Sequence, residues 1–107
     1  MAYEYATRDP LMLESDLEKK FRHRVRTELH GRVFQLMPTV AGIPDRMILL
    51  PWGRIFLVEM KTTDGRLRPD QIEWHRKAAL LGVEVATLYG LEDIDKWMSD
   101  HGGSSNG

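Results

Sequence analysis

The sequence lacks cysteine altogether among its 107 residues. This absence excludes disulfides and thiolate metal sites, and it favours a reducing compartment, which we expect to be the cytoplasm. No apolar run is long enough to cross a membrane, and the first residues lack the basic and apolar regions of a signal peptide. The four histidines are scattered and show no zinc-motif spacing. A disulfide scaffold, a zinc finger and a membrane partner are therefore not expected.

The length predicts a single domain over residues 1–100, followed by a flexible tail at 101–107 that is rich in glycine and serine. Apolar residues make up 42% of the chain, which is enough for one modest core. A domain this small buries a limited fraction of its surface, so a partner subunit would help to stabilise it.

The chain also lacks the net positive charge that is typical of a nucleic-acid-binding protein, because its formal charge is −1. The charges are, however, unevenly distributed. Between Lys19 and Lys77 lie thirteen of the fifteen Lys and Arg residues but only six of the sixteen Asp and Glu residues. The middle of the chain is basic and its flanks are acidic. The net charge therefore does not suggest a nucleic-acid partner, but the distribution of the charges along the chain permits one.

Hydrophobic periodicity predicts a mixed α/β fold in which helices flank a central sheet, in the order α-β-β-β-α-β-α. A capping box of Ser15 and Glu18 is expected to begin the first helix, and Gly31 to end it. The remaining elements are expected at residues 33–37, 46–50 and 55–61 (strands), 69–81 (helix), 83–88 (strand) and 91–99 (helix). The strands at 46–50 and 55–61 are expected to form a hairpin.

Glu59 and Lys61 are two residues apart on a predicted strand, so their side chains point to the same face. The preceding residues 55–58 are all apolar, which suggests a strand that is buried on both faces. Charged residues at the end of such a strand are costly unless they are paired or bound. From this triplet alone, a structural ion pair near a sheet edge is the more frequent explanation.

Asp45 strengthens the functional interpretation because hairpin pairing brings the start of its strand beside the end of the Glu59 strand. Two adjacent carboxylates repel each other unless a proton or a cation lies between them. Mg²⁺ and Mn²⁺ favour such oxygen ligands. The alternative for Asp45 is a turn residue after a proline, or a partner of Arg46.

Two further polar side chains are expected on the inward faces of their helices. Glu18 falls within the apolar arc of the first helix, where a lone glutamate is unusual, although a capping role alone would explain it. Gln71 projects into the apolar arc of the second helix. It needs hydrogen-bond partners there, and free backbone groups at the helix start are an alternative to a functional partner.

Together these motifs resemble the VRR-NUC (virus-type replication-repair nuclease) family, a branch of the PD-(D/E)-x-K nucleases with a restriction-endonuclease-like fold. The resemblance rests on Gly42-x-Pro44-Asp45-Arg46, on Glu59-x-Lys61 and on Gln71, preceded by Ser15-x-Leu17-Glu18-Lys19. Residues 81–85 also fit the helix-to-strand step of the family. The similarity covers roughly residues 14 to 96. Met60 departs from the leucine that is frequent in the family. In the family this position contributes its backbone carbonyl to the metal, so the change of side chain should not matter.

The resemblance implies a Mg²⁺- or Mn²⁺-dependent endodeoxyribonuclease. Its metal ligands would be Glu18, Asp45, Glu59 and the carbonyl of Met60, and Lys61 would be the catalytic lysine. In its small, stand-alone size the chain is similar to phage-encoded homodimeric enzymes that cut branched DNA, including four-way (Holliday) junctions. Larger relatives carry the domain in DNA repair. A non-catalytic DNA-binding or assembly module and a nuclease for linear duplex DNA remain the alternatives.

Contacts with DNA are expected from positive side chains. The best candidates are Arg66 and Arg68, in the loop beside the site, followed by Arg46, for which pairing with an acid is the alternative. Lys19 and Arg22 lie away from the apolar stripe of the first helix. They are further candidates, against the alternative of a solvated surface.

Overall fold

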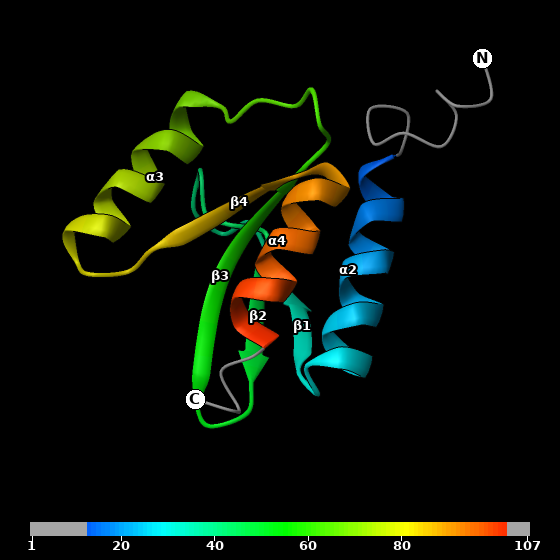
Figure 1. Cartoon of the computed structure of the whole chain (residues 1–107). Coiled ribbons are helices and arrows are strands. Elements are labelled where there is room, and N and C mark those ends of the chain that lie inside the picture. The colour runs from blue at the N-terminus through cyan, green and yellow to red at the C-terminus, as the bar shows by residue number, and fades with distance from the viewer. Residues whose placement is uncertain (1–12, 103–107) are drawn as a thin grey trace, which may run out of the picture.

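The computed structural model describes residues 13–102, which form three helices and a four-stranded sheet (Figure 1). The elements in chain order are α2 (Glu14–Glu28), β1 (Arg32–Gln35), β2 (Arg46–Leu50), β3 (Arg54–Lys61), α3 (Pro69–Leu80), β4 (Val85–Tyr89) and α4 (Gly90–Gly102). The sheet order is β1-β2-β3-β4, with two antiparallel pairs followed by the parallel pair β3–β4. The predicted fold class, element order and hairpin are confirmed, and in the described part of the chain no helix is long and apolar enough to span a membrane.

The hydrophobic core lies between one face of the sheet and helices α2 and α4. Its largest fully buried side chains include Phe21 of α2, Ile48 of β2, Met60 of β3 and Ile94 of α4. Because side chains alternate along a strand, Glu59 and Lys61 point to the opposite face from Met60. That opposite face is the one beside which the crossover helix α3 lies.

Helix α2 begins two residues earlier than the expected capping box allows. Its N-cap is Leu13, and no side chain caps the helix. The prediction that Ser15 and Glu18 form a capping box is therefore wrong, and the Glu18 carboxylate is available for other partners. At the other end the left-handed residue is His30 (φ 58°) rather than Gly31.

The face of β3 that carries Glu59 is only partly covered, contrary to the prediction of a strand buried on both faces. Ile55, on this face, is 63% exposed. The reason lies in α3, which reaches β4 but leaves the beginning of β3 uncovered (Figure 1). The expected apolar arc of α3 is also largely exposed, since Ile72 and Leu81 are 54% and 83% accessible.

The C-terminal helix is longer than predicted. α4 continues through His101 and Gly102, because the ring of His101 packs against Phe56 and Trp97. These two residues therefore belong to the domain and not to a tail that begins at 101. The rest of the predicted tail, 103–107, and the start of the predicted domain, 1–12, lie outside the described residues.

Candidate functional site

Asp45 and Glu59 lie side by side where β2 begins and β3 approaches its end. The antiparallel register pairs Arg46 with Val58, and its continuation by one residue places Asp45 opposite Glu59. The backbone N–H of Met60 donates a hydrogen bond to Oδ1 of Asp45 over 3.2 Å. This bond fixes the Asp45 carboxylate against β3, so the juxtaposition expected from the hairpin is present.

Glu59 is a buried carboxylate without a full set of partners. It is 3% exposed, and its Oε1 has no hydrogen-bond partner among the described residues. Burial, followed by the negative charge of Asp45, raises the pKa of Glu59 to about 7, against the opposing charges of Lys61 and Arg68. At neutral pH this carboxylate is therefore poised to exchange a proton for another cation.

Burial also raises the pKa of Asp45, whose ionised form is partly stabilised by the charge of Arg46 and by the Met60 N–H. Burial disfavours the charged form of both carboxyl groups, and when both are ionised their negative charges also repel each other. A divalent cation between them would relieve that cost, and hard oxygen ligands suit Mg²⁺ and Mn²⁺.

In a regular strand the carbonyl of a residue points to the same side as its N–H, which for Met60 is the side of β2. The register would place Pro44 opposite Met60, and proline has no N–H to donate to this carbonyl. Pro44 thereby opens the ladder at the point where Asp45 approaches β3. The Met60 carbonyl oxygen is consequently well placed to act as a third oxygen ligand.

Lys61 follows Glu59 on the same face of β3, where its charge lowers the pKa of Glu59. It is half-buried, and its side chain forms no hydrogen bond or ion pair with the residues from 13 to 102. An ammonium group beside two carboxylates can orient a water molecule or stabilise negative charge.

The structure does not place Glu18 with the other acids. Its Oε2 accepts hydrogen bonds from Arg22 (2.8 Å) and from Nε of Arg46 (3.3 Å). Arg46 in turn lies 3.6 Å from Asp45 and is 12% exposed. Both ion pairs use Oε2 and hold the Glu18 carboxylate against the two guanidinium groups, and the burial of Arg46 between two acids argues against a contact of Arg46 with DNA.

Glu14 is the acid of α2 whose charge reaches the site, and it raises the pKa of both Asp45 and Glu59. The sequence points to Glu18, and not to Glu14, as the candidate acid of this helix. A signal for Glu14 was nevertheless present. Glu14 stands one turn before Glu18 on the helix. Glu18 has a basic partner one turn further on, at Arg22, whereas Glu14 is followed one turn on by the acidic Glu18.

Gln71 is buried at the start of α3, where its Oε1 accepts a hydrogen bond from the backbone N–H of Arg68 at 2.8 Å. This is the structural alternative noted for Gln71. The start of α3 lies close against the loop before Asp45. The approach is so close that a Cβ on Gly42 (φ +85°) would collide with the Asp70 carbonyl. Gln71 thus helps to position the helix beside the site.

The basic candidates fall into two groups. Arg68 is 61% exposed at its side chain, pairs with Asp70, and is close enough for its charge to lower the pKa of Glu59. Arg66 is exposed in the same connection between β3 and α3. Lys19 and Arg22 belong to α2, on the other side of the sheet, and are exposed there.

The residues present fit a divalent cation, although incompletely. In favour of the fit is the buried Oε1 of Glu59, which lacks a partner and lies next to a second carboxylate. Against it, residues 13–102 contain no group of three or more His, Asp or Glu that could hold a metal ion. Asp45, Glu59 and the Met60 carbonyl would therefore form the protein part of the site, and water or substrate would supply the other oxygens.

Comparison with known proteins places this chain among nucleases. No protein-family model matches the chain. It is 33% identical over 79 residues to "Putative nuclease p44" of Acyrthosiphon pisum secondary endosymbiont phage 1, an alignment that covers 73% of this chain and 84% of that protein. A solved structure described as "VRR_NUC domain" superimposes with a TM-score of 0.73 and 28% identity, covering 82% of this chain and 95% of the other.

Proposed function

Because this chain belongs to the VRR-NUC family of nucleases, we propose that it is an endonuclease that uses Mg²⁺ or Mn²⁺ to hydrolyse phosphodiester bonds in DNA. The observation that carries the proposal is the buried Glu59 carboxylate, which lies beside Asp45 with one oxygen unpartnered among the described residues. Two such groups are a costly arrangement for a purely structural site.

The mechanism we propose assigns each site residue a role. The cation would lower the pKa of the attacking water and neutralise charge on the phosphate. Asp45 and Glu59 would hold it together with the Met60 carbonyl, after Glu59 has lost its proton. Lys61 would orient the water or stabilise the negative charge that develops on the phosphate oxygens.

The groups around this centre would position it and grip the substrate. Gln71 would fix the start of α3 beside the site through its bond to the Arg68 backbone. Arg66 and Arg68 would contact backbone phosphates of DNA. Glu18 we assign to holding Arg46, which keeps a positive charge next to Asp45, rather than to direct metal binding.

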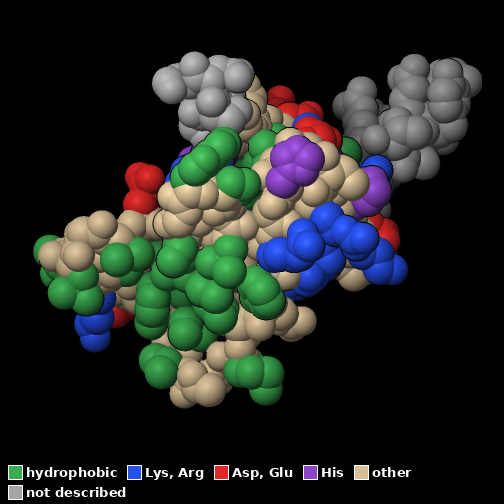
Figure 2. All heavy atoms as spheres, turned by 90° about the horizontal axis from the view of Figure 1, so that it is seen from below, with side chains coloured by type: hydrophobic (Ala, Val, Ile, Leu, Met, Phe, Trp, Pro, Cys, Tyr) green, Lys and Arg blue, Asp and Glu red, His purple; other side chains and the backbone are tan. Residues whose placement is uncertain are grey.

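Branched DNA, in particular a four-way junction, is the substrate that the family resemblance favours. A homodimer would supply two active sites for symmetrical cutting. An apolar face supports a partner subunit: Ile55, Leu57 and Val83 line one cavity, and the exposed Leu80 and Leu81 shortly precede Val83 in sequence. Figure 2 shows hydrophobic side chains gathered on the face seen from below.

The decisive experiment is a cleavage panel with a four-way junction, a linear duplex and a single strand, each with Mg²⁺, Mn²⁺ or EDTA. We expect metal-dependent cutting with preference for the junction. D45A and K61A should abolish the cutting, and K61A should still bind DNA. Equal cutting of all three substrates would refute the preference for a junction. The absence of cutting by a folded, metal-loaded protein would refute the proposed endonuclease activity.

A non-catalytic DNA-binding module is the second candidate. It is favoured by the incomplete set of acidic ligands within the described residues. Calorimetric titration separates the two: binding of Mn²⁺ that is lost in D45N supports the nuclease, whereas DNA binding without metal binding or cutting would establish the module.

A further inference from the structure

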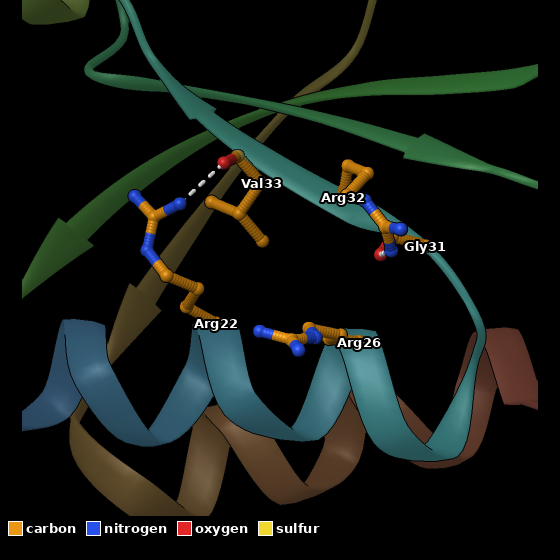
Figure 3. A pocket seen from close by; sticks show the side chains of 5 residues that line it. All are labelled: Arg22, Arg26, Gly31, Arg32 and Val33. Carbon is orange, nitrogen blue, oxygen red and sulfur yellow. Dashed lines mark hydrogen bonds between the residues drawn. The ribbon is translucent and has the colours of Figure 1, made fainter.

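A cavity that is separate from the acidic site lies between α2 and β1 (Figure 3). It has a volume of about 180 Å³ and is lined by Arg22, Arg26, Gly31, Arg32 and Val33. Three arginines line this small space, and none of the described residues that line it is acidic. We call this set the arginine pocket. Figure 3 shows Arg22 reaching from the helix to the Val33 carbonyl of the strand, and Arg26 on the next turn of the same helix.

The hydrogen bonds around the pocket orient these arginines but leave most of their charge unpaired. Nη1 of Arg22 donates to the Val33 carbonyl (2.6 Å) while its other nitrogens bond to Glu18. Nη1 of Arg32 donates only to the Gly31 carbonyl (3.0 Å). Arg26 has no hydrogen bond or ion pair with any residue between 13 and 102. Within the described part of the chain, two of the three positive charges are therefore not paired with an acid.

This arrangement differs from that of other arginines on the helix surfaces. Arg24, on the same helix, is paired with Glu28 and Asp95, and Arg76 of α3 is paired with Glu73. Like charges that converge without acids repel each other, and an anion that fits between them removes the repulsion. The guanidinium fork matches the geometry of phosphate oxygens in particular.

The chain brings the three arginines together by two local features. Arg22 and Arg26 are one helical turn apart and lie on one face of α2. Gly31 then lets β1 lie against the rest of the molecule, because a Cβ at this position would meet the Leu50 side chain at 2.5 Å and the Leu49 carbonyl at 2.6 Å. The close approach places Arg32 beside the helix.

We propose that the arginine pocket binds a backbone phosphate of DNA outside the bond that is cut. The inference rests on the proposed nuclease function and extends its DNA-binding surface. From Glu14, whose charge reaches the acidic site, to Arg26 is about 18 Å along α2, which is about five base pairs of duplex. In Figure 2 basic side chains gather on the side of α2 and β1, away from the hydrophobic group nearer α3.

The test is DNA binding by the double variant R26Q/R32Q in EDTA, measured by fluorescence anisotropy between 50 and 200 mM salt. We expect at least a tenfold loss of affinity for the double variant, and a salt slope that is smaller by about 1, since one lost phosphate contact contributes about 0.9. R26K/R32K, which keeps the charge but loses the fork, should fall between the double variant and wild type.

Lys96→Gln is the matched control, because Lys96 is an exposed cation of α4 that is paired with Asp100, away from both sites. It should bind DNA nearly as wild type does. Thermal unfolding should show that R26Q/R32Q remains folded, since the substitution removes repulsion. Titration with inorganic phosphate distinguishes a site for free anions. If R26Q/R32Q loses the binding of inorganic phosphate but keeps the wild-type DNA affinity and salt slope, the pocket is a site for free anions and the proposal is overturned.

The outcomes also separate this inference from the proposed function. If wild type cuts DNA and R26Q/R32Q binds it with the wild-type affinity and salt slope, the pocket assignment alone fails. If wild type neither binds nor cuts DNA, the proposed function fails and the pocket assignment fails with it.

Discussion

The carboxylates of Asp45 and Glu59 lie next to each other, and the pKa of Glu59 is raised to about 7, first by burial and then by the charge of Asp45. Pro44 and the Met60 N–H make this proximity possible, because the ladder ends where the Asp45 side chain takes over the hydrogen bond. The consequences can be measured with and without metal.

Without metal, the free energy of unfolding should fall as the pH rises from about 5 to 8. The folded Glu59 binds its proton more tightly than the unfolded chain does, so the folded state is favoured at low pH and loses that advantage as pH passes 7. The loss is on the order of 3 kcal/mol. Denaturation in EDTA at several pH values tests this, and E59Q should have a much flatter pH profile. Parallel profiles for the two proteins would contradict it.

Metal binding should show the opposite pH dependence, because the cation competes with the proton on Glu59. Mn²⁺ affinity should be about tenfold weaker at pH 6 than at pH 8, and binding near pH 7 should release protons. Calorimetry in buffers of different ionisation enthalpy measures both effects. D45N, which removes one proposed ligand, should lose the binding. The same affinity at both pH values would exclude Glu59 as a ligand.

The ion pair of Glu18 with Arg46 should contribute to stability more than to metal binding. Both side chains are only 12–13% exposed, so E18Q should cost about 2 kcal/mol by leaving Arg46 with less compensation. E28Q, which breaks an exposed ion pair on the same helix, should cost about 0.5 kcal/mol or less. Titration of E18Q with Mn²⁺ should give nearly wild-type affinity, and a loss as large as that of D45N would make Glu18 a ligand.

Gly42 should be far more sensitive to a methyl group than Gly82 is. Both have positive φ (+85° and +84°), so each Gly→Ala change carries the same backbone strain of about 1–2 kcal/mol. Only at Gly42 would the new Cβ meet the backbone of Asp70, whereas nothing lies within 4 Å at Gly82. G42A should therefore be the less stable variant and should lose cutting activity through displacement of α3. Equal melting temperatures would contradict the close approach.

The apolar face should mediate the homodimer. Light scattering of wild type should give twice the monomer mass of 12.4 kDa, and I55E should give the monomer, because a charge at an apolar interface is costly. F34E alters an exposed aromatic residue at the opposite edge of the sheet and should remain dimeric. A monomeric wild type would remove the dimer from the proposal, and a monomeric F34E would move the interface to β1.

The sequence by itself determined which residues meet at the centre of the candidate site. Glu59 and Lys61 share a face because strand side chains alternate, and Asp45 joins them because a hairpin pairs residues that are close in sequence. Both rules are local, so neither needs knowledge of the distant chain. Gln71 was likewise placed correctly at a buried position from the period of its helix.

Only the tertiary structure decided the partners of Glu18 and the exposure of β3. Arg46 is 28 residues from Glu18 in sequence, and the two meet because α2 packs across the sheet. Ile55 is exposed because α3 rests beside β4 and leaves the start of β3 uncovered, which no pattern within residues 55–58 can reveal. Periodicity reports which face of an element is apolar, whereas long-range packing decides what that face meets.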